Sequence, residues 1–186
     1  MLCGHGYRPS SYVGVDIFWE GAEEFAKENA EKIHRTFMVN VETRNQSSEL
    51  AAGNASFDTA FMLETLEHLP KEKETLQNIF AALKPGGILF LTVPIEFGVL
   101  FAIKEIARRI LSGSSDYTIG EFFMALFGRM EDVRRIVGDH KGYDFRKTCG
   151  ILLGLGFELL DEKIYPGPTA YFGYSHISVW KKPNPN

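Results

Sequence analysis

Two carboxylates and an imidazole lie close together in the tract Glu64-Thr65-Leu66-Glu67-His68. Oxygen and nitrogen donors at this spacing can bind a hard or borderline divalent cation. The alternative is structural: Glu67 and His68 shape a binding pocket and cap the helix that begins at Pro70. We expect the structural role and assign no metal ligand to this tract.

A second imidazole, His140, lies in the segment from Gly138 to Asp144, before a helix candidate. Because the pKa of histidine lies near neutrality, His140 could take a proton from a substrate hydroxyl. A loop histidine bonded to the backbone is the alternative. His140 is our candidate catalytic base.

A third candidate is Asp16, which ends the β-prone run from Tyr12 to Val15 and precedes a helix candidate. In nucleotide-binding α/β folds, a carboxylate in this place accepts hydrogen bonds from the two vicinal hydroxyls of a ribose. An acid after a strand is also a common helix cap. Asp16 alone leaves both roles open.

The elements that must position these side chains alternate between strand and helix patterns. This alternation predicts an α/β fold with a mostly parallel sheet, helices on both of its faces and a C-terminal antiparallel strand. The continuous apolar run 88–93 predicts a strand buried on both faces. We expect strands over residues 12–16, 36–41, 57–63, 88–93, 157–163 and 176–181, and helices over 20–34, 70–83 and from 144 to 154 or 156.

Residues 95–139 interrupt the alternation, because two helical patterns follow each other there without a strand. Phe97, Phe101 and Ile106 mark the apolar side of the first pattern, and the second runs from Phe122 to Val137. An insertion after a buried strand lies at the carboxyl end of the sheet, where open α/β folds bind ligands. It is either a lid over a substrate or a helical pair packed on the core or on a second subunit.

The composition limits the function classes. The chain has 186 residues, 45% of them hydrophobic, and a formal net charge of -4, which favours one domain over residues 1–186 and argues against nucleic-acid binding. No apolar run is long enough to form a transmembrane segment, and no leader pattern opens the chain, so we expect a cytoplasmic protein. Cys3 and Cys149 suggest neither a disulfide framework nor a metal site.

Four tracts in a fixed order resemble the Rossmann-like (class I) S-adenosylmethionine-dependent methyltransferases, in the subgroup that methylates small molecules. They cover most of residues 12–94, and the ordered set is far more specific than any single tract. The tracts are Tyr12-Val13-Gly14-Val15-Asp16-Ile17, Ser56-Phe57-Asp58-Thr59-Ala60, Leu63-Glu64-Thr65-Leu66-Glu67-His68-Leu69 and Leu83-Lys84-Pro85-Gly86-Gly87-Ile88-Leu89.

The resemblance implies S-adenosylmethionine as cofactor, S-adenosylhomocysteine as product and a small-molecule substrate. Asp16 would hold the ribose, and Ile17 would lie against the adenine. Val41 and Glu42 match the end of the next strand, where Glu42 would meet the adenine amino group. Met62 and Leu63 would pass under the methionine part, and His68 would shape the pocket.

Quinone-pathway O-methyltransferases are similar in two further places. They carry a Glu-x-x-Glu-His tract and use a divalent ion, although many other relatives carry the tract without a metal. They also have a Gly-x-His sequence like Gly138-Asp139-His140, before the helix that leads to a Gly-Phe strand start, here Gly156-Phe157.

The chain departs from the family before Asp16. Only 15 residues precede it, too few for the family's first strand, glycine-rich turn and first helix. A missing first strand would leave two sheet edges unpaired. The gene start could be misassigned, the chain could be a natural fragment, or residues 1–11 or another subunit could fill the gap, which makes a homodimer possible. In the first two cases we expect weak or absent cofactor binding.

The sequence therefore predicts methyl transfer to a small apolar or aromatic acceptor, with oxygen as the favoured target atom. The rival hypothesis is a non-catalytic binding or assembly module. A nicotinamide-dependent oxidoreductase is a more distant alternative, because it would also need the glycine-rich turn.

Overall fold

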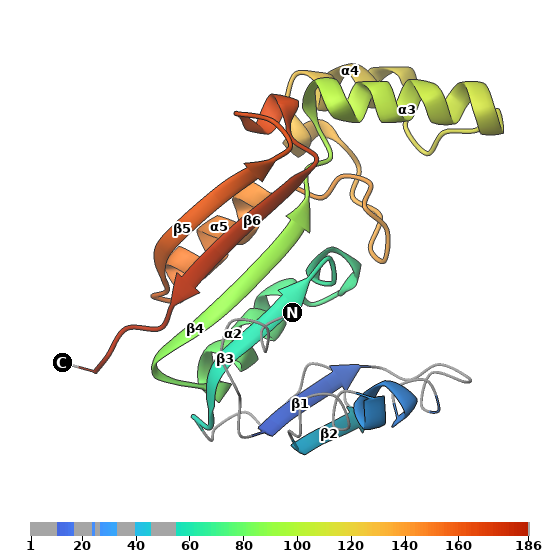
Figure 1. Cartoon of the computed structure of the whole chain (residues 1–186). Coiled ribbons are helices and arrows are strands. Elements are labelled where there is room, and N and C mark those ends of the chain that lie inside the picture. The colour runs from blue at the N-terminus through green and yellow to red at the C-terminus, as the bar shows by residue number, and fades with distance from the viewer. Residues whose placement is uncertain (1–10, 17–23, 25–26, 33–39, 46–54, 186) are drawn as a thin grey trace. The chain divides into compact units, whose positions relative to one another are not determined.

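The computed structural model describes residues 11–16, 24, 27–32, 40–45 and 55–185 (Figure 1). The chain divides into two compact units, Met1–Ala52 and Gly53–Asn186. Among the described residues, no helix has the length and apolar character needed to cross a bilayer.

The first unit contains a two-stranded parallel sheet. Strand β1 (Ser11–Asp16) pairs with β2 (Asn40–Asn45), and Asp16 lies opposite Asn45. Residues 24 and 27–32, within the expected helix 20–34, are helical. The strand that we expected to end at Val41 instead continues to Asn45. Its polar residues resembled a loop, but backbone pairing with β1 extends the strand to Asn45.

The second unit is built on a four-stranded sheet in the order β3-β4-β6-β5 (Figure 1). Strands β3 (Phe57–Leu63) and β4 (Leu83–Pro94) are parallel, whereas β6 (Ser175–Lys181) is antiparallel to both β4 and β5 (Glu158–Tyr165). The mixed α/β class and the closing antiparallel pair are confirmed. Among the described strands, β3 pairs only with β4, and β1 only with β2.

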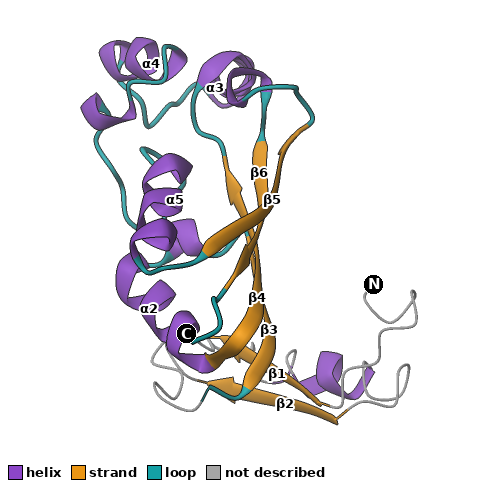
Figure 2. Cartoon of the chain, turned by 90° about the vertical axis from the view of Figure 1, so that its left-hand side faces the viewer, coloured by secondary structure: helices purple, strands orange, loops and turns teal. Residues whose placement is uncertain are grey.

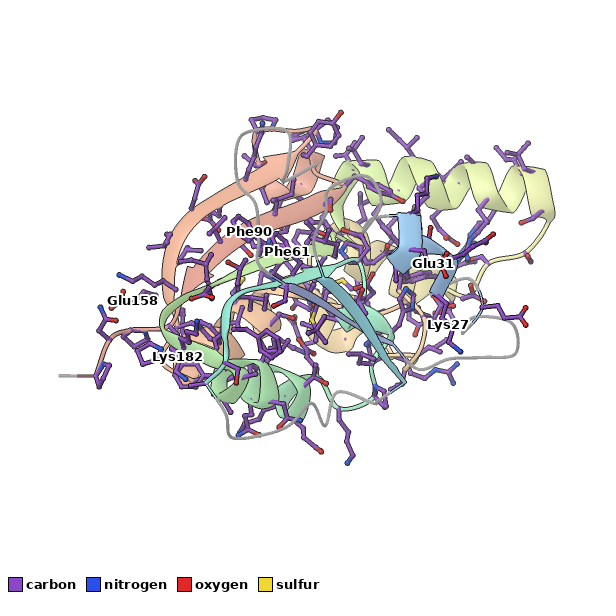
Figure 3. All side chains as sticks on the ribbon, turned by 60° about the horizontal axis from the view of Figure 1, so that its bottom comes forward. Lys27, Glu31, Phe61, Phe90, Glu158 and Lys182 are labelled. Atoms are coloured by element: carbon purple, nitrogen blue, oxygen red, sulfur yellow. The ribbon has the colours of Figure 1, made fainter. Side chains whose placement is uncertain are left out.

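Helices α2 (Glu72–Ala82) and α5 (Phe145–Gly154) both lie on one side of this sheet (Figure 2). Under them, every second side chain of β4 is buried, namely Leu89, Leu91 and Val93, together with Trp180 of β6. The expectation that β4 is buried on both faces is wrong. On the other face Phe61 is 38% exposed and stacks on Phe90, with ring centroids 5.0 Å apart (Figure 3).

The tract Lys84-Pro85-Gly86-Gly87 ends α2 as expected, but it lies within the bounds of β4. The register jumps there, because Phe57 pairs with Leu83 and Thr59 pairs with Ile88. Gly86 has a φ of 75°, a backbone conformation that favours glycine. The tract is therefore a bulge that turns the chain into the central part of β4.

The segment 95–139 contains two helices, α3 (Gly98–Ser112) and α4 (Ile119–Leu126), at the end of the sheet where β4 finishes (Figure 1). A capping box between Thr118 and Glu121 begins α4. The second helix is shorter than predicted, because it stops before Gly128, whose φ is 74°. One short 3-10 turn, η3 (Met130–Asp132), replaces the rest.

Candidate functional site

The parallel strands β3 and β4 finish at the same edge of the sheet, since Leu63 lies opposite Thr92. The chain leaves β3 through Glu64, with a φ of 48°, into the short helix η2 (Leu66–His68). It leaves β4 through Glu96 into α3. The loop that follows the insertion brings His140 back to the same place, so three separate segments build the site.

His68 and His140 are in contact, with their Nε2 atoms 3.3 Å apart and their ring centroids 4.9 Å apart. The carboxylate of Glu67 lies beside both rings, with Oε1 3.6 Å from Nε2 of His68 and 3.9 Å from Nε2 of His140. Glu67 is fully buried, and neither of its carboxylate oxygens has a hydrogen-bond partner in the described part of the chain. A buried polar group without a hydrogen-bond partner lowers the stability of the fold, and its presence therefore marks a candidate functional site.

The other side of His140 faces Glu96. Its Nδ1 lies 3.5 Å from Oε1 of Glu96, and the same oxygen accepts a hydrogen bond of 2.7 Å from Nζ of Lys104. Glu96 is buried, whereas the side chains of Lys104 and His140 are both 37% exposed. The imidazole of His140 therefore lies between two buried carboxylates.

Arg135 fixes the loop that carries His140. Its guanidinium donates hydrogen bonds to the carbonyls of Ile136, Asp139 and Lys141. It also donates to the carbonyl of Glu67, which ties this loop to η2. Local sequence patterns do not single out Arg135, because a loop that gathers its carbonyls around one side chain leaves no periodic signal.

The surroundings change how the two central groups titrate. Burial raises the pKa of the Glu67 carboxyl. The neighbouring Glu96 raises the pKa of His140, while burial opposes that change. Both shifts favour the protonated forms of Glu67 and His140, as expected where carboxylates and imidazoles share a partly buried space.

A cavity of about 170 Å³ opens beside His140. Most of the residues that line it are charged, and they come from the start and middle of α3, the segment between α3 and α4, and the loop around His140. The lining residues are Glu96, Lys104, Glu105, Arg108, Asp116, Tyr117, Asp139, His140 and Lys141. The volume suits a small molecule or the reactive end of a larger one.

Glu67, His68 and His140 also offer one ligand atom each within 4.8 Å of one another. This donor set suits a borderline divalent cation, so the alternative raised from the sequence gains His140 as a third donor. Glu64, the other carboxylate of the tract, instead accepts a hydrogen bond of 2.8 Å from the hydroxyl of Ser175.

The expected cofactor residues fall in both units. In the second unit, Met62 and Leu63 occupy the carboxyl end of β3, where Leu63 is 55% exposed, and His68 follows in η2. In the first unit, Asp16 ends β1, and Ile17 lies outside the described residues.

Val41 and Glu42 lie near the start of β2 rather than at its end. In the register of this sheet, the residue at the end of β2 beside Asp16 is Asn45, which the sequence interpretation missed. The reason is the misplaced strand boundary described above.

Comparison with known proteins supports one family. Residues 2–89 match the model of a methyltransferase domain. This match supports a class I methyltransferase domain in the chain. A ubiquinone biosynthesis O-methyltransferase of Xanthomonas euvesicatoria is 38% identical over 86 residues, which span 42% of this chain and 36% of that relative. The match thus covers about a third of the curated relative's length.

Solved structures support the same fold. A S-adenosylmethionine-dependent methyltransferase of Methanosarcina mazei has a TM-score of 0.57 at 17% identity and covers 98% of both chains. The 1,6-didemethyltoxoflavin-N1-methyltransferase of Burkholderia thailandensis has a TM-score of 0.53 at 16% identity, covering 98% of this chain and 75% of that one. That structure contains bound S-adenosylhomocysteine. S-adenosylmethionine is the cofactor of this methyltransferase class, as the sequence resemblance implied.

Proposed function

We propose that the chain transfers a methyl group from S-adenosylmethionine to an oxygen atom of a small hydroxylated acceptor. The observation that carries this proposal is the position of His140, at the carboxyl end of the sheet and on the wall of the polar cavity. An imidazole in this place is within reach of a hydroxyl that enters the cavity. The similarity to an O-methyltransferase supports oxygen as the target.

The described residues fit the cofactor at the end of β3. Leu63 leaves an apolar surface uncovered there, and in the short helix η2 that follows, the buried carboxylate of Glu67 has no hydrogen-bond partner among the described residues. Met62, Leu63 and His68 would hold the methionine part. In the first unit, Asp16 at the end of β1 would hold the ribose. When bound, S-adenosylmethionine supplies a methyl group on a positively charged sulfur.

The protein's own contribution is alignment and proton removal. Methyl transfer from a sulfonium depends mainly on holding nucleophile, carbon and sulfur in line. The acceptor O–H bond breaks as its proton passes to the imidazole of His140, which leaves on the oxygen the electron pair that would replace the sulfur at the methyl carbon of the bound cofactor. Glu67 and His68, next to Nε2 of that ring, would stabilise the imidazolium that results.

The acceptor is proposed to combine a polar reactive end with an apolar or aromatic body. Charged side chains line the cavity and offer hydrogen-bond partners to a hydroxyl-bearing end. The insertion also exposes apolar side chains, among them Ile106 and Phe123, against which an aromatic body would pack.

An assay of S-adenosylhomocysteine release tests the proposal. Hydroxylated aromatic compounds should be methylated, and His140→Gln should lower kcat by about 100-fold, the usual contribution of a positioned base. Glu158→Gln, at an exposed acid of β5, is the control and should keep full activity. Full activity of His140→Gln, or methylation confined to nitrogen acceptors, would contradict the proposal. A parallel assay in EDTA tells the base role from a metal-dependent one.

The pairing of the strands favours a second candidate, a non-catalytic binding or assembly module. In the described part of the chain one edge of β3 has no partner strand, and Phe61 and Leu63 are exposed there. Calorimetric titration separates the two candidates: micromolar affinity for S-adenosylmethionine supports the enzyme, and no binding supports the module.

A further inference from the structure

The guanidinium of Arg135 joins two segments that build the candidate site from distant parts of the chain. One is the loop between η3 and α5, which carries His140, and the other is η2, which carries His68. We infer that Arg135 is a positioning residue that locks this loop to η2 and so sets where His140 lies. The consequence for catalysis rests on the proposed function, but the lock itself is measurable in the absence of activity.

The loop depends on Arg135 because it has no regular structure of its own. Residues 133–144 form neither helix nor strand. Nη1 of Arg135 donates to the carbonyl oxygens of Ile136 at 2.8 Å and of Lys141 at 3.1 Å. The carbonyl oxygen of Asp139 accepts a further hydrogen bond from the same nitrogen. Three carbonyls of one loop therefore converge on a single atom.

The other end of the guanidinium reaches the second segment. Nη2 of Arg135 donates to the carbonyl oxygen of Glu67, which belongs to η2. The loop and η2 also meet through His68, whose Nδ1 lies 3.1 Å from the carbonyl oxygen of Gly138 and whose ring contacts that of His140. Because the His68 side chain is 44% exposed, water competes for its contacts, and Arg135 supplies a link that does not depend on this ring.

The position of the guanidinium is selective for its shape. Its Cζ lies 5.3 Å from the ring centre of Tyr143, which is buried, so an aromatic face covers it. The other described contacts of Arg135 are to carbonyl oxygens and not to a carboxylate. A planar group with donors on separate nitrogens can bridge the two segments, whereas the single nitrogen of lysine cannot. A free guanidinium ion should therefore bind in the same place when the side chain is removed.

Loss of the lock should reduce the rate of methyl transfer. A loop released from η2 moves His140 away from its place beside the cavity, and a displacement of about 1 Å can cost about 100-fold in rate. We therefore expect Arg135→Ala to lower kcat by about 10–100-fold. Guanidinium should restore part of this loss, which a general weakening of the fold would not allow.

Amide hydrogen exchange of the full chain tests the lock without any substrate. The reporters are the backbone amides of Ile136 and Tyr143, which donate to the carbonyls of Lys141 and His140. Removal of hydrogen bonds from a charged group should speed their exchange by about 10–100-fold in Arg135→Ala. Arg135→Lys should show the same increase. The measurement is made in EDTA, so that no divalent ion holds the loop in place of the guanidinium.

Arg134→Ala is the matched control, because it removes the same side chain from the preceding position. The described hydrogen bond from Arg134 to Glu121 comes from the backbone N–H, which alanine retains. Its exchange should be that of the wild type. Guanidinium chloride at about 50 mM, well below denaturing concentrations, should slow the exchange of Arg135→Ala, whereas methylammonium chloride should not.

Wild-type exchange in Arg135→Ala or Arg135→Lys overturns the inference, and so does equally fast exchange in Arg134→Ala. Failure of guanidinium to slow the exchange of Arg135→Ala also overturns it. If Arg135→Ala does not fold, the exchange of Arg135→Lys decides. A lock that guanidinium restores in a chain that methylates nothing would refute the proposed function and leave the role of Arg135 intact.

Discussion

Replacing Glu67 with Gln should stabilise the fold while it impairs function. The Glu67 carboxylate is fully buried without a hydrogen-bond partner among the described residues, and Nε2 atoms of two imidazoles lie 3.6 and 3.9 Å away. An unsatisfied buried polar group costs about 1–3 kcal/mol. A neutral amide is cheaper to bury, and its N–H can donate to either imidazole. We expect a gain of about 2 kcal/mol, or about 4–8 °C in Tm for a chain of this size.

The gain should depend on pH. Burial raises the pKa of Glu67 above 4.5, so the folded state binds this proton more tightly than the unfolded state. Stability contributed by a raised carboxyl pKa is present below the unfolded value and is lost as pH rises through the folded value. The advantage of Glu67→Gln should therefore be small in acid and largest in mildly alkaline buffer. Urea denaturation in EDTA at several pH values measures it.

A destabilised Glu67→Gln, or a gain that is independent of pH, would refute this reasoning. Glu121 provides a control of opposite sign. Burial opposes the change, but the Lys141 ammonium and the backbone N–H groups of Thr118 and Arg134 lower the pKa of Glu121 to about 2. Its ionised form therefore stabilises the fold by up to about 3 kcal/mol, and this stability is lost as pH falls from 4.5 towards 2. Glu121→Gln should be destabilised near neutral pH.

Two further predictions concern the elements that hold the site. Gly98 has a φ of 86°, and a Cβ there would lie 2.6 Å from the carbonyl oxygen of Tyr171, so Gly98→Ala should cost about 2–4 kcal/mol of unfolding free energy. A thermal melt within 2 °C of wild type would show that the start of α3 can shift at little cost. The Asp144 side chain caps α5 by accepting from the backbone N–H of Arg146 and pairs with the Arg146 guanidinium at 2.8 Å. Asp144→Ala should cost about 1–2 kcal/mol in chemical denaturation, and an unchanged midpoint would assign the cap no energetic role.

Local patterns in the sequence predicted much of the fold, because the local structure of these segments depends mainly on neighbouring residues. The alternation of apolar runs gave β3, β5 and β6 nearly to the residue, and Asp144 marked the start of α5. Two boundaries were wrong. The polar residues 42–45 continue a strand, because backbone pairing decides where that strand ends. The helical pattern after Leu126 does not continue a helix, because a left-handed glycine, Gly128, follows.

The candidate site could be predicted only in part. His68 and His140 were each recognised as candidates, and their contact across 72 positions was not, because nothing in a local pattern reports a distance of that kind. Glu96 and Arg135 were missed as site residues. Their chemistry depends on a carboxylate buried next to an imidazole and on carbonyls gathered around a guanidinium, and both arrangements exist only after the loops have packed.

The sequence by itself determined the family, because the ordered tracts along residues 12–89 record the local turns and strand ends that a methyltransferase domain requires. The tertiary structure decided the chemistry of the site. It buried Glu67 without a hydrogen-bond partner among the described residues, placed His140 between Glu67 and Glu96, and lined the neighbouring cavity with charged residues. The physical reason is that burial and charge pairing arise between distant segments, so they appear only when the sheet edge and the insertion come together.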